Sequence, residues 1–240
     1  MSHAAVGTGF EFGLSRGRAR LNFCRPRPTM ERPSRKGRPF VYGWMMRDLF
    51  DTPILPGLHA VENFVSQTEA AALIAAIDAT DLEPFRFQGW LGKRLTHSFG
   101  WHYDFDTGGM GEAAPIPDWL DPLRRRGEIM AGLAEGDLVQ ALVIRYDVGA
   151  GIGWHRDRPH FEHVFGISLG APATLRFRRR IDDRFERANV PLTPRGAYHL
   201  SGPARHVWEH SIAEMDAPRW SITFRSLSEK GRALIASRDR

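Results

Sequence analysis

Cysteine is almost absent from this sequence of 240 residues, in which Cys24 is the single example. One cysteine excludes an internal disulfide framework and any cysteine-rich zinc or iron–sulfur site. No run approaches the length of about 18 apolar residues that a membrane-spanning helix needs. The first thirty residues also lack the continuous apolar stretch of a secretory signal. These absences predict a reducing, cytoplasmic setting without a membrane partner.

Acidic residues are scarce only at the N-terminus. Residues 1–40 hold nine basic and two acidic residues, a net charge of +7, whereas the other 200 residues hold 24 basic and 26 acidic residues, a net charge of −2. The basic segment is rich in Gly, Pro, Ser and Arg and has no apolar period, which predicts a disordered extension. Residues 41–240 are expected to form a single domain. Nucleic-acid binding by that domain would need a local basic patch, because its overall charge does not favour it.

The pattern after residue 60 predicts one helix followed by many strands. Residues 63–78 carry an apolar stripe, and Ser66 with Glu69 forms a capping box, which favours a helix. From residue 84 onward, short apolar runs are broken by Gly, Pro and Asp, which is typical of a β-sandwich or barrel. A second helix is expected at 116–134. Hydrophobic residues make up 42% of the sequence, enough for a substantial core.

The segment WHRD carries a candidate metal site. His155 and Asp157 are two positions apart, so on a strand their side chains would share a face. His210 would complete a set of two histidines and one carboxylate, which binds Fe(II) on one side and leaves three positions open. His206 competes as the third ligand, and His102 with Asp104 repeats the same spacing.

The segment RWSITFR, residues 219–225, would have one polar and one apolar face as a strand. The polar face carries Arg219, Ser221, Thr223 and Arg225. A buried guanidinium requires an anion, and its planar fork suits a carboxylate. A diacid that reaches both arginines and the metal fits 2-oxoglutarate. The alternative is an edge strand whose arginines face solvent.

These segments together resemble the AlkB family of Fe(II)/2-oxoglutarate dioxygenases over about residues 84–227. The similarity is densest in IRYDVGAGIGWHRD, GISLGAPATLRF, GAYHLSGPARHVWEHSI and RWSITFR. The resemblance implies a mainly β double-stranded β-helix, or jelly roll, with flanking helices. It places a lid at about 84–115 and the catalytic jelly roll at about 138–228. It also implies Fe(II), 2-oxoglutarate and O2 as cofactor and co-substrates.

The resemblance assigns roles residue by residue. The positions of the three iron ligands are occupied by His155, Asp157 and His210. The co-substrate positions are occupied by Tyr146, Arg219, Ser221 and Arg225, with Arg219 on the distal carboxylate. This sequence departs from the family at Ile144 and Ser221, which replace asparagines. It also departs at Pro159, which replaces an acidic residue that contacts the base in repair members.

The candidate substrate contacts lie in the expected lid and are Arg94, Trp101, His102 and Tyr103. Aromatic rings there could stack on a flipped base, although packing of the lid on the core is an alternative. Arg176, Arg178 and Arg180 alternate on another predicted strand. They could contact phosphates, or they could form a solvated strand face.

The function that the resemblance implies is oxidative dealkylation of N-alkylated bases in DNA or RNA by a monomer. One alternative is a 2-oxoglutarate-dependent hydroxylase or demethylase of a protein or small molecule, which Pro159 keeps open. Another is a jelly-roll binding module without turnover.

Overall fold

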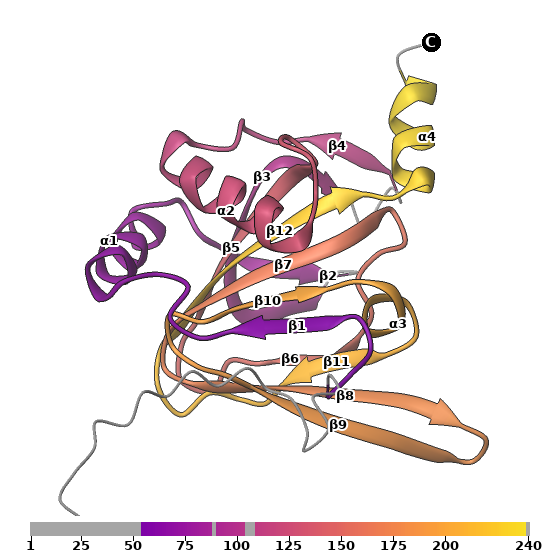
Figure 1. Cartoon of the computed structure of the whole chain (residues 1–240). Helices are drawn as coiled ribbons and strands as arrows, with labels where there is room; N and C mark the ends of the chain where they lie inside the picture. The colour runs from indigo at the N-terminus through magenta and orange to yellow at the C-terminus, as the bar shows by residue number, and fades with distance from the viewer. Residues whose placement is uncertain (1–53, 88–89, 104–108, 239–240) are drawn as a thin grey trace, which may run out of the picture. The chain divides into compact units, whose positions relative to one another are not determined.

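A computed structural model describes residues 54–238 except 88–89 and 104–108, and all described residues belong to one compact unit. The predicted basic extension at 1–40 lies outside the described residues. In the part that is described, the chain forms two antiparallel sheets that pack face to face (Figure 1).

The larger sheet has eight strands in the described residues. Its order is β1 (Leu58–Val61), β10 (Ala197–Leu200), β7 (Phe161–Gly170), β12 (Arg219–Leu227), β5 (Leu138–Tyr146), β3 (Trp90–Tyr103) and β2 (Glu83–Phe87), with β4 (Met110–Glu112) beside β3. The smaller sheet has the order β6 (Ile152–His155), β11 (Glu209–Ile212), β8 (Ala173–Ile181) and β9 (Arg184–Leu192). Apart from β2–β3, β3–β4 and β8–β9, the neighbouring strands are not consecutive in the chain, so segments distant in sequence meet inside the fold.

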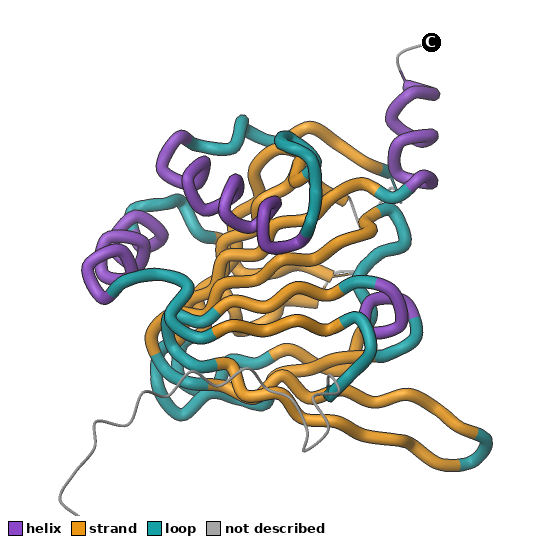
Figure 2. Tube along the Cα trace, in the orientation of Figure 1, coloured by secondary structure: helices purple, strands orange, loops and turns teal. Residues whose placement is uncertain are grey.

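The helices lie mainly against the larger sheet, and Figure 2 separates them from the strands by colour. They are α1 (Gln67–Asp78), the 3-10 turn η1 (Asp118–Leu120), α2 (Asp121–Ala131), α3 (Gly202–His206) and α4 (Glu229–Arg238). None of the helices within the described ranges is long and apolar enough to cross a membrane.

The sequence predicted a helix at 63–78, but α1 begins later, at Gln67. The Ser66 hydroxyl accepts from the backbone N–H of Glu69 at 3.1 Å, while the Ser66 backbone N–H donates to the Glu69 carboxylate at 2.7 Å. This reciprocal cap fixes the first turn. The helix predicted at 116–134 is shorter as well, because α2 spans Asp121–Ala131 and is capped by Gly132, whose φ of 67° is in the left-handed region.

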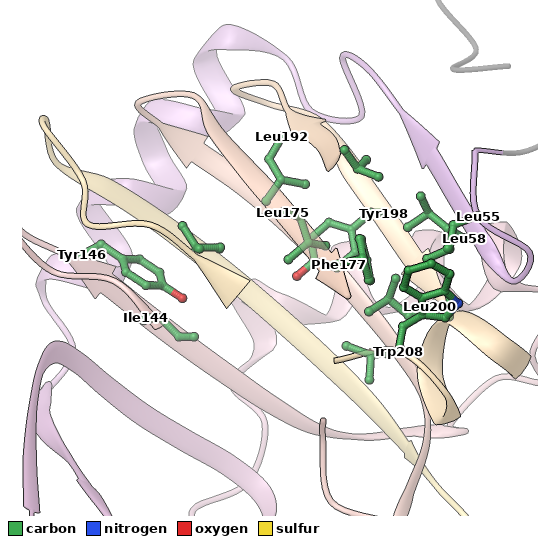
Figure 3. Packing of buried hydrophobic residues seen from close by; sticks show 14 of the residues in the cluster. Leu55, Leu58, Ile144, Tyr146, Leu175, Phe177, Leu192, Tyr198, Leu200 and Trp208 are labelled. Atoms are coloured by element: carbon green, nitrogen blue, oxygen red, sulfur yellow. The ribbon is translucent and has the colours of Figure 1, made fainter. Parts of the chain in front are cut away.

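Two apolar cores explain why the sheets stack. One lies between the sheets, where Ile144 and Tyr146 of the larger sheet join a cluster with Leu175 and Phe177 of the smaller sheet (Figure 3). The other lies between the larger sheet and helices α1 and α2. The double-stranded β-helix prediction is confirmed by this arrangement.

Strand β12 is central, because it pairs with β5 on one side and β7 on the other. Ile222 and Phe224 belong to the core beneath the helices and are fully buried. The alternate residues of β12 therefore point to the space between the sheets. The edge-strand alternative for RWSITFR is wrong, and Arg219 is only 1% exposed.

Candidate active site

The three predicted metal ligands meet between the sheets. His155 ends β6 and pairs with His210 on β11, and Asp157 follows two residues later in the loop after β6. One ligand atom from each residue lies within 4.8 Å of the others, and the two imidazole centroids are 4.3 Å apart. Two imidazole nitrogens and one carboxylate oxygen can therefore bind a single ion.

The environment favours the metal-binding form of both histidines. Nδ1 of His155 lies 2.8 Å from the Gly153 carbonyl oxygen, so in the neutral ring this nitrogen donates and Nε2 keeps its lone pair. Burial lowers the pKa of His155, and burial with the neighbouring His155 lowers the pKa of His210 to about 3. Both rings are consequently neutral near pH 7, as metal ligation requires.

Asp157 is held as a carboxylate by Arg225. Burial opposes its ionisation, but the Arg225 guanidinium and the neighbouring histidines outweigh burial and hold the pKa of Asp157 well below its usual range. Nη2 of Arg225 lies 3.3 Å from Oδ1 of Asp157, and the two side chains are 12% and 10% exposed. Arg225 also donates from Nη1 to Oε1 of Gln140 at 3.0 Å. Arg225 thus contacts the carboxylate ligand itself.

The loop that follows Asp157 is held by a buried arginine from α3. Arg205 is 3% exposed and donates to three carbonyl oxygens of this loop. The distances are 3.2 Å to Asp157, 2.5 Å to Arg158 and 2.6 Å to Phe161. The backbone of a metal ligand is therefore tied to the segment that leads to His210.

Ser228, just after β12, holds the remaining two carbonyls of the same loop. Its hydroxyl donates to Pro159 at 2.7 Å, and its backbone N–H donates to His160 at 2.9 Å. All five carbonyl groups from Asp157 to Phe161 consequently have a donor. Such saturation fixes the loop as a rigid support for the ligand.

Arg219 has the surroundings of an anion-binding residue. Its Nε donates to Oγ of Ser168 at 3.2 Å, and its guanidinium carbon lies 5.0 Å from the Tyr146 ring centroid. Its Nη1 is buried without a hydrogen-bond partner within the described residues. A buried guanidinium with an open donor calls for a carboxylate.

The other predicted co-substrate residues face the same space. Ser221 is 3% exposed and lies opposite both Ile144 and Ser168 in the register. Tyr198 was not predicted as a residue of this site. Its ring lies against Gly166, where any side chain in place of the glycine would collide with the ring. Burial raises the pKa of Tyr198 to about 12, so its hydroxyl stays protonated and can donate.

The residues present fit Fe(II) and 2-oxoglutarate. The donor set of two imidazoles and one carboxylate is the set typical of non-haem iron oxygenases, and Arg219 offers an unused donor to a carboxylate. When bound, iron with 2-oxoglutarate supplies the oxidation of a C–H bond by O2, with release of succinate and CO2. His155, Asp157 and His210 would hold the metal, and Arg219 would orient the diacid.

One predicted lid residue lies close to the metal-binding loop. The Tyr103 ring stacks on His160 with centroids 5.2 Å apart, and Arg158 lies 4.7 Å from the Tyr103 centroid. Arg94 is also near, because its charge acts on the pKa of His155. Its guanidinium lies 3.8 Å from the Phe85 centroid, and its Nε is buried without a hydrogen-bond partner in the described region.

The other two residues predicted for the lid, Trp101 and His102, lie beside β4. Trp101 and His102 lie on β3 and pair with Glu112 and Gly111 of β4. The His102 ring covers Gly111 so closely that a side chain at Gly111 would collide with it. His102 therefore packs inside the lid, and Asp104, its partner in the repeated spacing, lies outside the described residues.

The competing ligand His206 ends the short helix α3, away from the triad. Its Nε2 lies 2.8 Å from Oε1 of Glu162, and its side chain is 43% exposed. Helix α3 occupies this segment, so His206 does not share a strand face with His210. Sequence reasoning missed Gln140, Ser168 and Arg205, although Gln140 and Ser168 are polar residues flanked by apolar residues.

A family model described as the 2OG-Fe(II) oxygenase superfamily matches residues 57–232. An Arabidopsis thaliana protein named "Alkylated DNA repair protein ALKBH8 homolog" is 27% identical over 184 residues, covering 66% of this chain and 51% of the relative. A Xenopus tropicalis protein named "tRNA (carboxymethyluridine(34)-5-O)-methyltransferase alkbh8" is 27% identical over 180 residues, covering 72% of this chain and 28% of the relative. The chain thus spans about half of the first curated relative and 28% of the second.

Solved structures share the fold at low sequence identity. The structure of OsALKBH1 superposes with a TM-score of 0.53 at 14% identity, covering 72% of this chain and 97% of that one. An oxidoreductase of the 2OG-Fe(II) oxygenase family from Burkholderia pseudomallei gives 0.51 at 15% identity, covering 71% and 85%. With the family match over residues 57–232, the chain belongs to the 2OG-Fe(II) oxygenase superfamily, which uses Fe(II), 2-oxoglutarate and O2, and it is similar to AlkB homologues within that superfamily.

Proposed function

We propose that this enzyme removes alkyl groups from N-alkylated bases in DNA or RNA. One oxygen atom of O2 would enter succinate and the other would convert an N–CH3 group into N–CH2OH. The N–CH2OH group then breaks its C–N bond, which releases formaldehyde and returns the proton to the base nitrogen. No side chain needs to act as an acid or a base in these reaction steps.

The observation that carries the proposal is the position of Tyr103 at the loop that follows Asp157. Its ring stacks on the buried His160, and the Arg158 guanidinium carbon lies 4.7 Å from its centroid. A flat base can stack on such rings, and a guanidinium can contact its phosphate. The names of the curated relatives, which mention alkylated DNA repair and tRNA, agree with this substrate class.

A second candidate is hydroxylation or demethylation of a protein or small molecule. Pro159 favours it, because proline has no acidic side chain to contact a base. Its carbonyl instead accepts from Ser228 and helps to fix the loop.

The test is a panel of methylated DNA, RNA and peptides, incubated with Fe(II), 2-oxoglutarate and O2. The proposal expects formaldehyde and succinate in equal amounts from at least one oligonucleotide. Tyr103→Ala should raise KM for that oligonucleotide, and Tyr103→Phe should restore it because the ring remains. Formaldehyde from peptides alone would refute the proposal in favour of the second candidate. Iron binding without succinate from any substrate would favour a binding module.

A further inference from the structure

The outer face of the smaller sheet carries a continuous stack of arginines and aromatic rings. The guanidinium carbons of Arg176 and Arg178 lie 5.3 and 4.5 Å from the Trp154 centroid. Arg178 also lies 4.7 Å from the Phe185 centroid, and Arg187 lies 5.6 Å from the same ring. These five residues, from β6, β8 and β9, are called the arginine–aromatic stack below.

The stack lies on the side of the sheet opposite the metal site. His155 and His210 point inward, so the alternate residues Trp154 and Ser211 point outward. Arg176 pairs with Ser211 in the register and donates to its hydroxyl at 3.1 Å. The described helices α1, α2 and α4 pack on the larger sheet or β4, which leaves this face to the stack.

This face is positively charged, whereas the domain as a whole has a small negative net charge. Arg156 lies between two metal ligands just after β6, its side chain is exposed, and its Nη1 lies 3.5 Å from the carbonyl oxygen of His206. Together with Arg176, Arg178 and Arg187 it gives four positive charges, offset by Glu209 2.6 Å from Arg178. A net +3 on one sheet face stands out in residues 41–240, whose net charge is −2. The acidic turn at 182–183 lies beyond the stack, at the end of the hairpin.

The stacked geometry suits phosphates. A guanidinium that lies flat on an aromatic ring keeps its N–H edge open for a bidentate contact and loses little side-chain entropy on binding. Arg176 and Arg178 are two positions apart on β8, a rise of about 7 Å, which is about two axial steps of one nucleic-acid strand. Figure 1 shows that the β8–β9 hairpin extends past the neighbouring strands, which lengthens this face.

We propose that the arginine–aromatic stack is a second nucleic-acid contact, which binds the sugar–phosphate backbone of the substrate outside the active site. The inference rests on the proposed function for its occupant, and it deepens that function by assigning the backbone to a named surface. Arg156 would continue the contact to the edge where His155 and Asp157 lie.

The test compares two double variants of equal charge in the full chain. Arg176→Gln with Arg187→Gln removes two members of the stack, and Arg125→Gln with Arg232→Gln removes two exposed arginines of α2 and α4. Binding of a fluorescent single-stranded oligonucleotide is measured from 0.05 to about 1 M salt. The stack variant should bind about 25-fold more weakly at 0.1 M salt, with a slope smaller by about 1.4, because two phosphate contacts are lost. The control should stay within about two-fold of the wild type.

The same variants separate this inference from the proposed function. If the wild type binds the oligonucleotide through the stack but releases no formaldehyde, the surface stands and the proposed function fails. If formaldehyde is released and the stack variant binds as tightly as the wild type, the inference is overturned and the function stands. Arg176→Lys with Arg187→Lys should restore only part of the affinity, and full recovery would overturn the role of stacking. A change in oligomeric state without loss of binding would make the face an interface between copies, which also overturns it.

Discussion

Replacement of Arg219 by methionine should separate stability from co-substrate binding. The side chain is 1% exposed, and its Nη1 has no hydrogen-bond partner within the described residues. Methionine keeps much of the volume without the charge, and such replacements are often neutral or stabilising by about 1–4 kcal/mol. The ligand-free protein with Arg219→Met should therefore unfold at the same or a higher urea concentration than the wild type.

The same change should remove most of the stabilisation by 2-oxoglutarate. Loss of one partner of a buried charge pair costs about 3–5 kcal/mol, or between two and four orders of magnitude in Kd. At a free 2-oxoglutarate concentration of 100 times the wild-type Kd, binding raises the free energy of unfolding of the wild type by about 2.7 kcal/mol. For Arg219→Met the gain should fall to about 0.4 kcal/mol or less.

The assay is urea unfolding with Mn(II), with and without 2-oxoglutarate. Arg145→Met is the matched control, because Arg145 lies on neighbouring β5 and its side chain is 36% exposed. The control should keep the full response to 2-oxoglutarate. An equal response in Arg219→Met would refute the assignment of Arg219 to the diacid.

Three further outcomes follow from the site and its supports. Asp157→Ala should weaken Mn(II) binding and abolish succinate formation, and normal succinate formation would contradict the metal site. Arg205→Gln should lower the free energy of unfolding in urea by about 3 kcal/mol and weaken Mn(II) binding, because buried carbonyls lose their donor. Ser228→Ala should lower the free energy of unfolding by about 1 kcal/mol. His199, whose Nε2 lies 2.9 Å from Nδ1 of His163, has its pKa lowered to about 4 by burial and this neighbour. Between about pH 6.5 and about pH 4 the unfolded chain therefore binds more protons at this position than the folded protein. As the pH falls through this range, the free energy of unfolding should fall by about 2 kcal/mol, a value already reduced for solvent screening. His199→Phe should flatten that part of the profile measured by urea unfolding.

The strand pattern made much of the site predictable. In RWSITFR, the period of two separated arginines from apolar residues, and β12 has this arrangement with both faces buried. The spacing of His155 and Asp157 correctly indicated two neighbouring ligands, although β6 ends at His155 and Asp157 lies in the loop and not on the same strand. These features depend on local geometry, which short sequence patterns describe well.

The supporting contacts could not be predicted, because they join segments distant in the chain. Arg205 is separated by 48 positions from Asp157, whose carbonyl it holds. Gln140 is 85 positions from Arg225. The segment at His206 was misjudged because a helix of five residues, too short for a periodic signal, turns it away from the site.

The saturated loop from Asp157 to Phe161 has a consequence for how new specificities can be selected. Its backbone is fixed by donors from Arg205 and Ser228, not by the side chains that the loop displays. Arg158 can therefore be exchanged while the carboxylate ligand keeps its position, whereas His160 is 7% exposed and stacks on Tyr103. Under the proposed function, a library randomised at Arg158 should retain metal binding in most members while the preferred substrate changes. The backbone of these five residues thus supports the ligand Asp157, and under the proposed function the side chain of Arg158 contributes to the choice of substrate.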